Sequence, residues 1–275
     1  MAIDEAEKAR RFQELHRRPG TFVIPNPWDA GSARILAALG FEALASTSSG
    51  FAFSLGRRDG ATTREELLAH LRAIAAATDL PVSADLERCF GDDPETVAET
   101  IRLAAGTGIV GGSVEDFTGD PRRPIYDLSQ AVERVAAAVE AARALPFPFT
   151  LTARAENYLH GRSDLDDTLK RLQAYEKAGA DVLYAPLLPD LAAIGAVTAA
   201  LSKPLNVLAG RPLLSVAELA GAGVKRISLG GLLSRAALGG LLRATREIRE
   251  RGTFGFAGDA ASSAELNEMM SPRAR

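Results

Sequence analysis

Short apolar runs alternate with longer amphipathic segments along most of this chain. The alternation occurs eight times between Thr21 and Arg251, and each short run has the length and the flanking turn residues of a strand. The longer Ala- and Leu-rich segments have the helical period. The eight predicted strands are Thr21–Pro25, Ala43–Ser48, Val82–Glu87, Gly112–Asp116, Phe149–Arg154, Asp181–Pro186, Leu205–Gly210 and Arg226–Gly230.

This order of elements predicts the fold class. Repeated strand–helix pairs imply a parallel sheet, and eight of them favour closure into a (β/α)8 TIM-type barrel over an open, doubly wound sheet. No Gly-x-Gly-x-x-Gly fingerprint supports the open alternative. We therefore expect one barrel domain at 1–251 and a C-terminal tail at 252–275 with a short helical segment. The aromatic pair Phe254 and Phe256 in that tail packs on a neighbouring subunit or on its own barrel.

Composition narrows the class of function. With 275 residues, 47% of them hydrophobic, the chain can bury one large core, and its net charge is only −3. The charges form no basic patch for nucleic acid or a membrane surface, and no apolar run reaches the roughly 20 residues of a membrane span. The lone Cys89 excludes an internal disulfide, and the charged start lacks a signal peptide's apolar core. These features predict a cytoplasmic protein that handles small molecules.

The third predicted strand has an unusual polar face. Ser83, Asp85 and Glu87 alternate with apolar residues, so the pattern places two carboxylates on one side of a strand that parallel barrels normally bury. Buried carboxylates need a partner, and a divalent metal is the simplest one. The alternative is a structural network in which they pair with Arg154 or Arg88.

Polar residues also cluster where the other predicted strands end. In a barrel of this type the active site lies at the carboxyl ends of the strands, so these residues are the candidates for chemistry. They are Asn26, Ser46, Thr47, Ser48, Ser49, Asp85, Glu87, Glu115, Asp116, Arg154, Glu156, Asn157, Asn206 and Gly230.

Three of these carboxylates could bind one metal ion. Asp85, Glu87 and Glu115 come from adjacent strands, and their oxygen ligands suit Mg²⁺ or Mn²⁺. Zinc is disfavoured, because the three histidines are far apart in sequence and there is no second cysteine. The segment from Ser46 to Gly50 is either a plain turn or a loop that offers N–H groups to an anion. Arg154 is either a bidentate carboxylate clamp or a neutraliser of Glu156.

Several ordered motifs resemble the isocitrate lyase and phosphoenolpyruvate mutase superfamily between about Phe22 and Phe256. Each motif is weak alone, but their order on an eightfold strand–helix pattern is specific. They are Asn26-Pro-Trp-Asp-Ala-Gly-Ser-Ala-Arg34, Ser46-Thr-Ser-Ser-Gly50, Leu55-Gly-Arg-Arg-Asp59-Gly60, Ser83-Ala-Asp85, Ser113-Val-Glu115-Asp116 and Thr152-Ala-Arg154-Ala-Glu156-Asn157.

The resemblance implies an Mg²⁺ enzyme that makes or breaks a bond beside a 2-oxo acid, through an enolate held by the metal. By position, Asp85 resembles the metal-binding aspartate and Glu115 the acid that reaches the metal through water. Asp59 resembles an acid that organises the site, and Arg154 resembles the arginine that grips a substrate carboxylate. The Ser46–Ser49 backbone resembles the donor loop for the other substrate end. Homodimers or homotetramers that exchange the last helical segment are also implied.

Two departures from the family pattern bear on the reaction. Ser83 stands where the family usually has a second aspartate, so Glu87 compensates or the metal binds through more water. The loop at 117–126 lacks the cysteine and histidine of the isocitrate and methylisocitrate lyases. Decarboxylation of an oxaloacetate-like diacid demands mainly enolate stabilisation and suits such a site.

We therefore predict a Mg²⁺-dependent carbon–carbon lyase that acts on a small anionic 2-oxo or 2-hydroxy di- or tricarboxylate, by oxaloacetate decarboxylase-like or 2-methylisocitrate lyase-like chemistry. Phosphoenolpyruvate mutase or phosphonopyruvate hydrolase chemistry at a P–C bond is one alternative. A barrel that binds a metabolite without turnover is another. The predicted residues are Arg154, Asp59 and Glu115 for catalysis, Ser46, Thr47, Ser48, Ser49, Arg154 and Asn206 for substrate binding, and Asp85, Glu87 and Glu115 for the metal.

Overall fold

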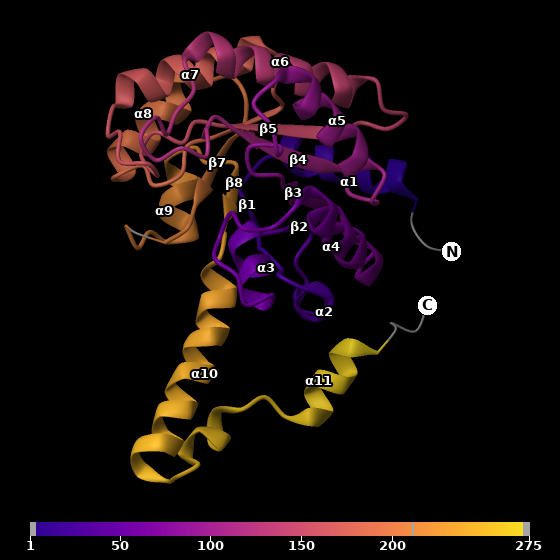
Figure 1. Cartoon of the computed structure of the whole chain (residues 1–275), viewed down its shortest axis with the longest axis vertical. Coiled ribbons are helices and arrows are strands. Elements are labelled where there is room, and N and C mark those ends of the chain that lie inside the picture. The colour runs from indigo at the N-terminus through magenta and orange to yellow at the C-terminus, as the bar shows by residue number, and fades with distance from the viewer. Residues whose placement is uncertain (1–3, 211, 272–275) are drawn as a thin grey trace.

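Eight parallel strands form a nearly closed barrel in the computed structural model of the protein, which describes residues 4–210 and 212–271. The strands lie in the order β1-β8-β7-β6-β5-β4-β3-β2, and the helices between them cover the outside of the barrel (Figure 1). This confirms the predicted (β/α)8 architecture. The strands are β1 (Phe22–Ile24), β2 (Leu44–Ala45), β3 (Val82–Asp85), β4 (Gly111–Glu115), β5 (Thr150–Arg154), β6 (Val182–Tyr184), β7 (Leu205–Leu208) and β8 (Arg226–Ser228).

Several helices begin at clear capping signals. Thr63 and Glu66 form a capping box at the start of α4, and Pro94 follows the N-cap Asp93 in α5. The helices are α1 (Glu5–Arg17), α2 (Ala30–Ala38), α3 (Ser48–Ser54), α4 (Arg64–Ala77), α5 (Pro94–Ala105), α6 (Leu128–Arg143), α7 (Leu165–Lys177), α8 (Leu191–Ala200), α9 (Val216–Gly221), α10 (Leu232–Arg251), the 3-10 turn η1 (Gly255–Asp259) and α11 (Ser263–Met270).

The third strand is shorter than the sequence pattern predicts. It ends at Asp85, and Glu87 has a left-handed backbone with φ of 50°. A non-glycine residue rarely adopts this conformation, and it breaks the alternation of a strand. The expectation that Glu87 shares a strand face with Ser83 and Asp85 is therefore wrong, because the chain turns before it.

The side chain of Asn26 bridges the seam of the barrel. Strands β1 and β2 meet through a backbone hydrogen bond from Ala45 N to Pro25 O, at 3.1 Å. Asn26, directly after β1, donates from Nδ2 to Ser46 O at 2.9 Å, and its Oδ1 accepts from Leu229 N at 2.8 Å and Gly230 N at 2.9 Å. One buried amide therefore connects the segments that follow β8 and β2.

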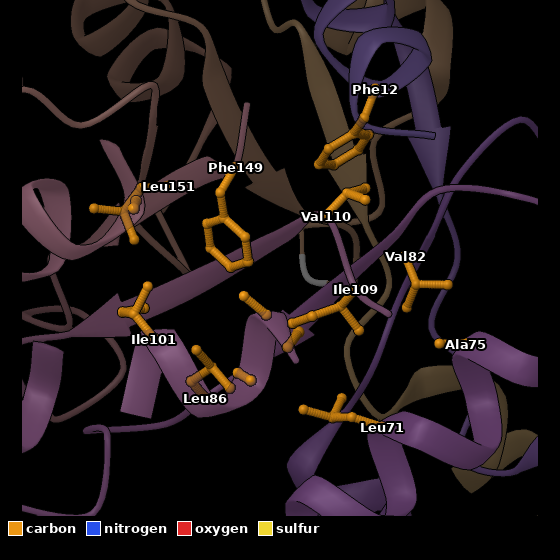
Figure 2. Packing of buried hydrophobic residues seen from close by; sticks show 14 of the residues in the cluster. Phe12, Leu71, Ala75, Val82, Leu86, Ile101, Ile109, Val110, Phe149 and Leu151 are labelled. Atoms are coloured by element: carbon orange, nitrogen blue, oxygen red, sulfur yellow. The ribbon is translucent and has the colours of Figure 1, made fainter. Parts of the chain in front are cut away.

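The amino end of the barrel is closed by α1. Phe12 of this helix is fully buried and lies beside Phe149 and Val110 (Figure 2). A Cβ at Gly111 would come within 2.9 Å of both the Phe12 ring and Thr150 O, so only glycine allows this close approach. Each buried Phe or Leu side chain contributes about 1.5–3 kcal/mol of burial free energy. Helix α1 therefore covers the amino end of the barrel core with apolar side chains.

The C-terminal segment extends away from the barrel and returns. Helix α10 projects outward, the chain reverses at Gly252, where φ is 65°, and α11 returns to pack on α2 (Figure 1). The Arg34 guanidinium donates a hydrogen bond to Met270 O. Phe254 stays largely exposed, so the tail's aromatic pair is not fully covered by its own barrel. Within the described ranges, no helix has the length and apolar character needed to cross a membrane.

Candidate active site

A cavity of about 170 Å³ opens at the carboxyl ends of the strands. Most of the predicted binding residues line it, whereas Glu87, Glu115 and Glu156 lie outside the lining. The lining consists of Ile24, Asn26, Ala45, Ser46, Thr47, Ser48, Ser49, Asp59, Ser83, Ala84, Asp85, Ser113, Arg154, Leu159, Tyr184, Pro186, Asn206, Leu208, Arg226, Ser228, Gly230 and Gly231.

Arg154 occupies the centre of the charged part of this cavity. Its Nη1 lies 3.1 Å from Asp85 Oδ1, its Nη2 lies 3.3 Å from Glu115 Oε2, and its Nε donates to Glu156 Oε1 at 2.6 Å. The guanidinium carbon lies 5.0 Å from the centroid of the Tyr184 ring. Both interpretations of Arg154 from the sequence are therefore compatible with its surroundings, since it neutralises Glu156 and also faces the cavity.

A second buried network fixes the backbone beside Arg154. Glu156 N donates to Asp116 Oδ1 at 2.8 Å, and Asp116 Oδ2 accepts from Arg171 at 3.1 Å and from Tyr175 at 2.6 Å. Asp116 is 3% exposed and lies outside the cavity. It therefore supports the end of β5 rather than facing a ligand.

The polar loop after β2 is fastened to Asp85. Ser46 Oγ accepts a hydrogen bond from Asp85 N at 2.9 Å, and Ser48 N donates to Asp85 Oδ2 at 3.0 Å. Thr47 caps α3. The segment is not a plain turn, because α3 begins at Ser48. Ser46 to Ser49 line the cavity, and the anion that the Ser48 N–H binds in this structure is the Asp85 carboxylate.

The carboxylates around Asp85 carry more negative charge than Arg154 alone balances. Burial raises the pKa of Asp59, and the Asp85 carboxylate raises it further. Burial, with Asp85 and Asp59, raises the pKa of Glu87 to about 7. Burial also raises the pKa of Glu115, against the opposing effect of Arg154. A positively charged ligand near Asp85 would favour the ionised form of all of these groups.

These residues fit a hard cation that keeps water ligands. The Glu87 Oε1 atom is buried and has no hydrogen-bond partner among the residues that the structure describes, and the Asp85 carboxylate faces the cavity. In the described part of the chain, no three His, Cys, Asp or Glu side chains stand close enough together to form a complete metal cluster. Mg²⁺ commonly binds through one or two carboxylates, with water and substrate as the other ligands. Asp85 could hold it directly, with Asp59, Glu87 and Glu115 around it.

The turn after β3 is held in place by hydrogen bonds from Arg134. Besides Glu87, Cys89 and Phe90 have positive φ values of 59° and 62°. Arg134 of α6 donates to Gly91 O at 2.5 Å and to Arg88 O at 2.7 Å. Cys89 is fully buried, and burial raises the pKa of its thiol to about 12, so it remains protonated and outside the cavity.

None of the residues 117–126, all of which the structure describes, lines the cavity. Phe117 and Ile125 form an antiparallel bridge, and the Phe117 ring stacks on His160 with centroids 3.9 Å apart. Tyr126 donates to Asp92 Oδ1 at 2.5 Å. Arg122 pairs with Asp120 and is solvent exposed. The loop is thus an ordered hairpin in which Arg122 binds Asp120 rather than lining the cavity.

Sequence reasoning missed the residues at the floor of the cavity. Tyr184, Arg226 and Ser228 come from β6 and β8 and line it together with Asn206. Asn206 donates to Ser228 Oγ at 2.9 Å and accepts from Arg226 Nε at 2.8 Å. The signal was present in the eighth strand, where Arg226 and Ser228 alternate with Ile227 and Leu229.

Known proteins resemble this chain over nearly all of its length. Residues 12–249 match the family described as phosphoenolpyruvate phosphomutase. The oxaloacetate decarboxylase of Bradyrhizobium diazoefficiens is 30% identical over 268 residues, which are 94% of this chain and 91% of that protein. The 2-methylisocitrate lyase of Escherichia coli K12 is 29% identical over 236 residues, which are 82% of this chain and 78% of that protein.

Solved structures of related proteins have a similar fold over nearly the whole chain. A protein of Burkholderia cenocepacia J2315, provisionally named a lyase/mutase, has a TM-score of 0.96 and 59% identity, with 98% of each chain covered. Oxaloacetate acetylhydrolase in complex with the product oxalate has a TM-score of 0.87 and 25% identity, over 97% of this chain and 94% of that one. The match over 12–249 and these likenesses place the chain in the phosphoenolpyruvate phosphomutase family, part of the phosphoenolpyruvate mutase/isocitrate lyase superfamily.

Proposed function

We propose that this protein is a Mg²⁺-dependent carbon–carbon lyase that acts on a small 2-oxo or 2-hydroxy di- or tricarboxylate, with decarboxylation of an oxaloacetate-like diacid as its reaction. The relatives named oxaloacetate decarboxylase and 2-methylisocitrate lyase support this class of substrate. The oxalate bound to the related acetylhydrolase supports a site for a small dicarboxylate.

The side chains of the cavity wall favour decarboxylation over cleavage of an isocitrate-like substrate. Among the described residues that line it, none is histidine, cysteine or lysine. Cleavage of isocitrate-like substrates requires a base for the hydroxyl group and an acid for the released carbanion. Decarboxylation of a 2-oxo diacid needs no base for a hydroxyl group: the C–C bond breaks with loss of CO2, the site stabilises the negative charge of the enolate that forms, and the enolate then takes a proton from water to give the 2-oxo acid product. A cavity rich in arginine, serine and carboxylate suits the second reaction better.

The chain's own groups have distinct parts in this proposal. Arg154 would bind the carboxylate next to the 2-oxo group with the N–H groups that Asp85, Glu115 and Glu156 leave free. The Ser48 N–H would hold the Asp85 carboxylate in place, and Ser46 Oγ would hold the Asp85 backbone N–H. Mg²⁺, when bound, would supply positive charge beside the 2-oxo oxygen. Asp59 would bind water near Asp85.

The oligomeric state and location belong to the same proposal. Leu241 and Leu242 of α10, the helix that projects from the barrel, are 58% and 52% exposed, and Phe254 after it is 65% exposed. Exposed apolar side chains grouped on one extension are typical of subunit contacts. We propose a cytoplasmic homodimer or homotetramer. Removal of the chain after Arg251 should reduce the number of subunits in the assembly, as measured by analytical ultracentrifugation.

Release of pyruvate from a small panel of acids tests the reaction. Oxaloacetate, 2-methylisocitrate, 2,3-dimethylmalate and phosphonopyruvate would each be supplied with Mg²⁺, with Mn²⁺ and with a chelator. The proposal predicts turnover of oxaloacetate that the chelator abolishes and Mg²⁺ restores.

Two other outcomes would contradict it. Preferential turnover of phosphonopyruvate would indicate P–C bond chemistry. An absence of turnover on every acid, combined with thermal stabilisation by one of them, would indicate a barrel that only binds a metabolite.

A further inference from the structure

Arg226 is a buried cation in the cavity wall. It is the first residue of β8, it is 5% exposed, and it lies in register between Asn206 of β7 and Phe22 of β1. Its Nε donates to Asn206 Oδ1 at 2.8 Å and its Nη2 to Thr152 Oγ1 at 2.9 Å. Its Nη1 lies 3.3 Å from His16 Nε2. Contacts with β5, β7 and α1 therefore place its head group inside the barrel.

Every one of these partners is uncharged. His16 Nδ1 lies 2.8 Å from Phe12 O, which assigns the ring proton to Nδ1 and leaves the Nε2 lone pair for Arg226. Burial, with the nearby Arg226 charge, lowers the pKa of His16 to about 3, so the ring is neutral. Residues 4–210 and 212–271 provide no ion pair for Arg226, whereas three carboxylates surround Arg154.

A buried arginine without a counter-ion is unfavourable unless a ligand compensates it. Burial lowers the pKa of Arg226 to about 10, so the group still carries its charge at neutral pH. A guanidinium has five N–H donors, and its contacts use three of them. One N–H therefore remains on each terminal nitrogen. Such a pair suits a carboxylate, which accepts two parallel hydrogen bonds.

We propose that Arg226 is an anion-binding residue at the cavity floor and receives the second carboxylate of a dicarboxylate ligand. The first carboxylate then lies at the Arg154 end, and the distance between the two arginines selects short diacids over monoacids. The cavity of about 170 Å³ is smaller than the roughly 300–1,000 Å³ of sites for drug-sized ligands, which agrees with a compact diacid. This inference rests on the substrate class of the proposed function and extends it to a specific residue.

Tyr184 connects the two arginines. Its ring lies under the Arg154 guanidinium, with the guanidinium carbon 5.0 Å from the ring centroid, and it lines the same cavity as Arg226. Ser228 hydrogen-bonds both to Tyr184 and to Asn206, the amide that holds Arg226 Nε. The floor is thus a preorganised polar network, which reduces the cost of binding an anion.

Binding of two matched ligands tests the inference without turnover. Malate and 2-hydroxybutyrate share a four-carbon 2-hydroxy acid skeleton, and only malate has a carboxylate at the far end. Titration calorimetry of the full chain with Mg²⁺ should show that malate binds at least about tenfold more tightly than 2-hydroxybutyrate. Arg226→Gln should weaken malate binding about 10- to 100-fold and change 2-hydroxybutyrate binding less than about twofold.

Two further variants keep the test decisive. Arg226→Lys retains the charge and should retain most of the preference for malate. His16→Glu places a carboxylate against Arg226, so it should remove the preference even if Arg226→Gln does not fold. Arg143→Gln is the matched control, since Arg143 pairs with Asp181 outside the cavity, and it should bind both ligands as the wild type does.

Equal binding of the two ligands by the wild type would overturn the inference, as would a malate preference that survives in Arg226→Gln or His16→Glu. The proposed function fails separately. A protein that does not turn over oxaloacetate, but whose malate preference depends on Arg226, retains the anion site and loses only the decarboxylase assignment.

Discussion

Arg154 and Asp85 form an ion pair at the carboxyl ends of β5 and β3, two strands that are separated by β4. The same Asp85 carboxylate receives the Ser48 N–H at 3.0 Å, and the Asp85 N–H donates to Ser46 Oγ. Asp85 therefore connects the cationic centre of the cavity to the polar loop after β2. Replacing Asp85 by asparagine can therefore show whether its carboxylate is needed for activity, for stability or for both.

Asp85→Asn should lower Mg²⁺-dependent pyruvate release by at least about 10²–10³-fold, because it removes the carboxylate that the cavity offers to a cation. The fold should persist, since Glu115 and Glu156 still pair with Arg154. Steady-state kinetics and thermal unfolding measure the two effects. Asp166→Asn makes the same chemical change on the exposed start of α7 and should leave both unchanged. Full activity in Asp85→Asn would remove Asp85 from the proposed site.

Asn26→Ala should destabilise the protein by about 2–5 kcal/mol. The substitution leaves three backbone groups, Ser46 O, Leu229 N and Gly230 N, without their side-chain partner next to the seam between β1 and β2. Urea unfolding at neutral pH measures the loss. Asn26→Asp keeps an oxygen for Leu229 N and Gly230 N and loses only the donor to Ser46 O, so it should cost less. Equal stability of Asn26→Ala and the wild type would show that the seam needs no bridge.

The sequence predicted the parts of the molecule that follow from local pattern. All eight strands lie within or next to their predicted runs, because burial on both faces leaves an apolar signal. The grouping of carboxylates around Arg154 could also be predicted, because parallel strands bring their carboxyl ends to one edge of the barrel. The path after Asp85 was not predicted, because Glu87, Cys89 and Phe90 take left-handed conformations without a glycine to signal them.

The remaining differences arise from contacts between distant segments. Asn26 meets Leu229 and Gly230 across about two hundred residues of sequence, which no local pattern records. In the sequence, Arg226 is one charged residue at the start of a short strand. In the folded barrel it contacts Asn206, Thr152 and His16. Only the closed barrel shows that no carboxylate of the described residues pairs with its charge.

Acid should destabilise the protein partly through His70. Burial lowers the pKa of His70 to about 4, against a small opposing effect of Asp29, and its ring stacks on Phe51 with centroids 3.9 Å apart. The unfolded chain binds the proton near pH 6.5 and the folded chain does not. The contribution of neutral His70 to the free energy of unfolding is therefore fully present above about pH 6.5. It falls as the pH decreases toward 4, by up to about 1.4 kcal/mol per pH unit.

His70→Phe should flatten this acid-side slope. Phenylalanine can keep the stacking on Phe51, and His70 Nε2 makes no hydrogen bond within the described part of the chain that the substitution would remove. Urea unfolding of both proteins between pH 7 and pH 5 measures the difference. The other acid-sensitive groups are common to the two proteins, so the difference between the curves isolates His70. Parallel curves would show that His70 is protonated equally in the folded and unfolded states.

Arg134→Met should reduce both stability and activity, although Arg134 lies outside the cavity. Its two hydrogen bonds hold Arg88 O and Gly91 O, and its guanidinium carbon lies 4.5 Å from the centroid of the Tyr126 ring. Their loss should cost about 2–4 kcal/mol of unfolding free energy in denaturant titrations. It also releases the left-handed turn at Glu87, so kcat should fall more than KM rises.

The lysine variant separates the two effects of Arg134. Arg134→Lys keeps the positive charge but cannot span both carbonyl groups with a planar fork. If the turn positions the carboxylates around Asp85, this variant should lose kcat nearly as much as Arg134→Met does. If Arg134 only balances charge beneath the site, the lysine should restore kcat while the methionine does not. A normal kcat in both variants, with stability reduced, would mean that the turn supports the fold alone.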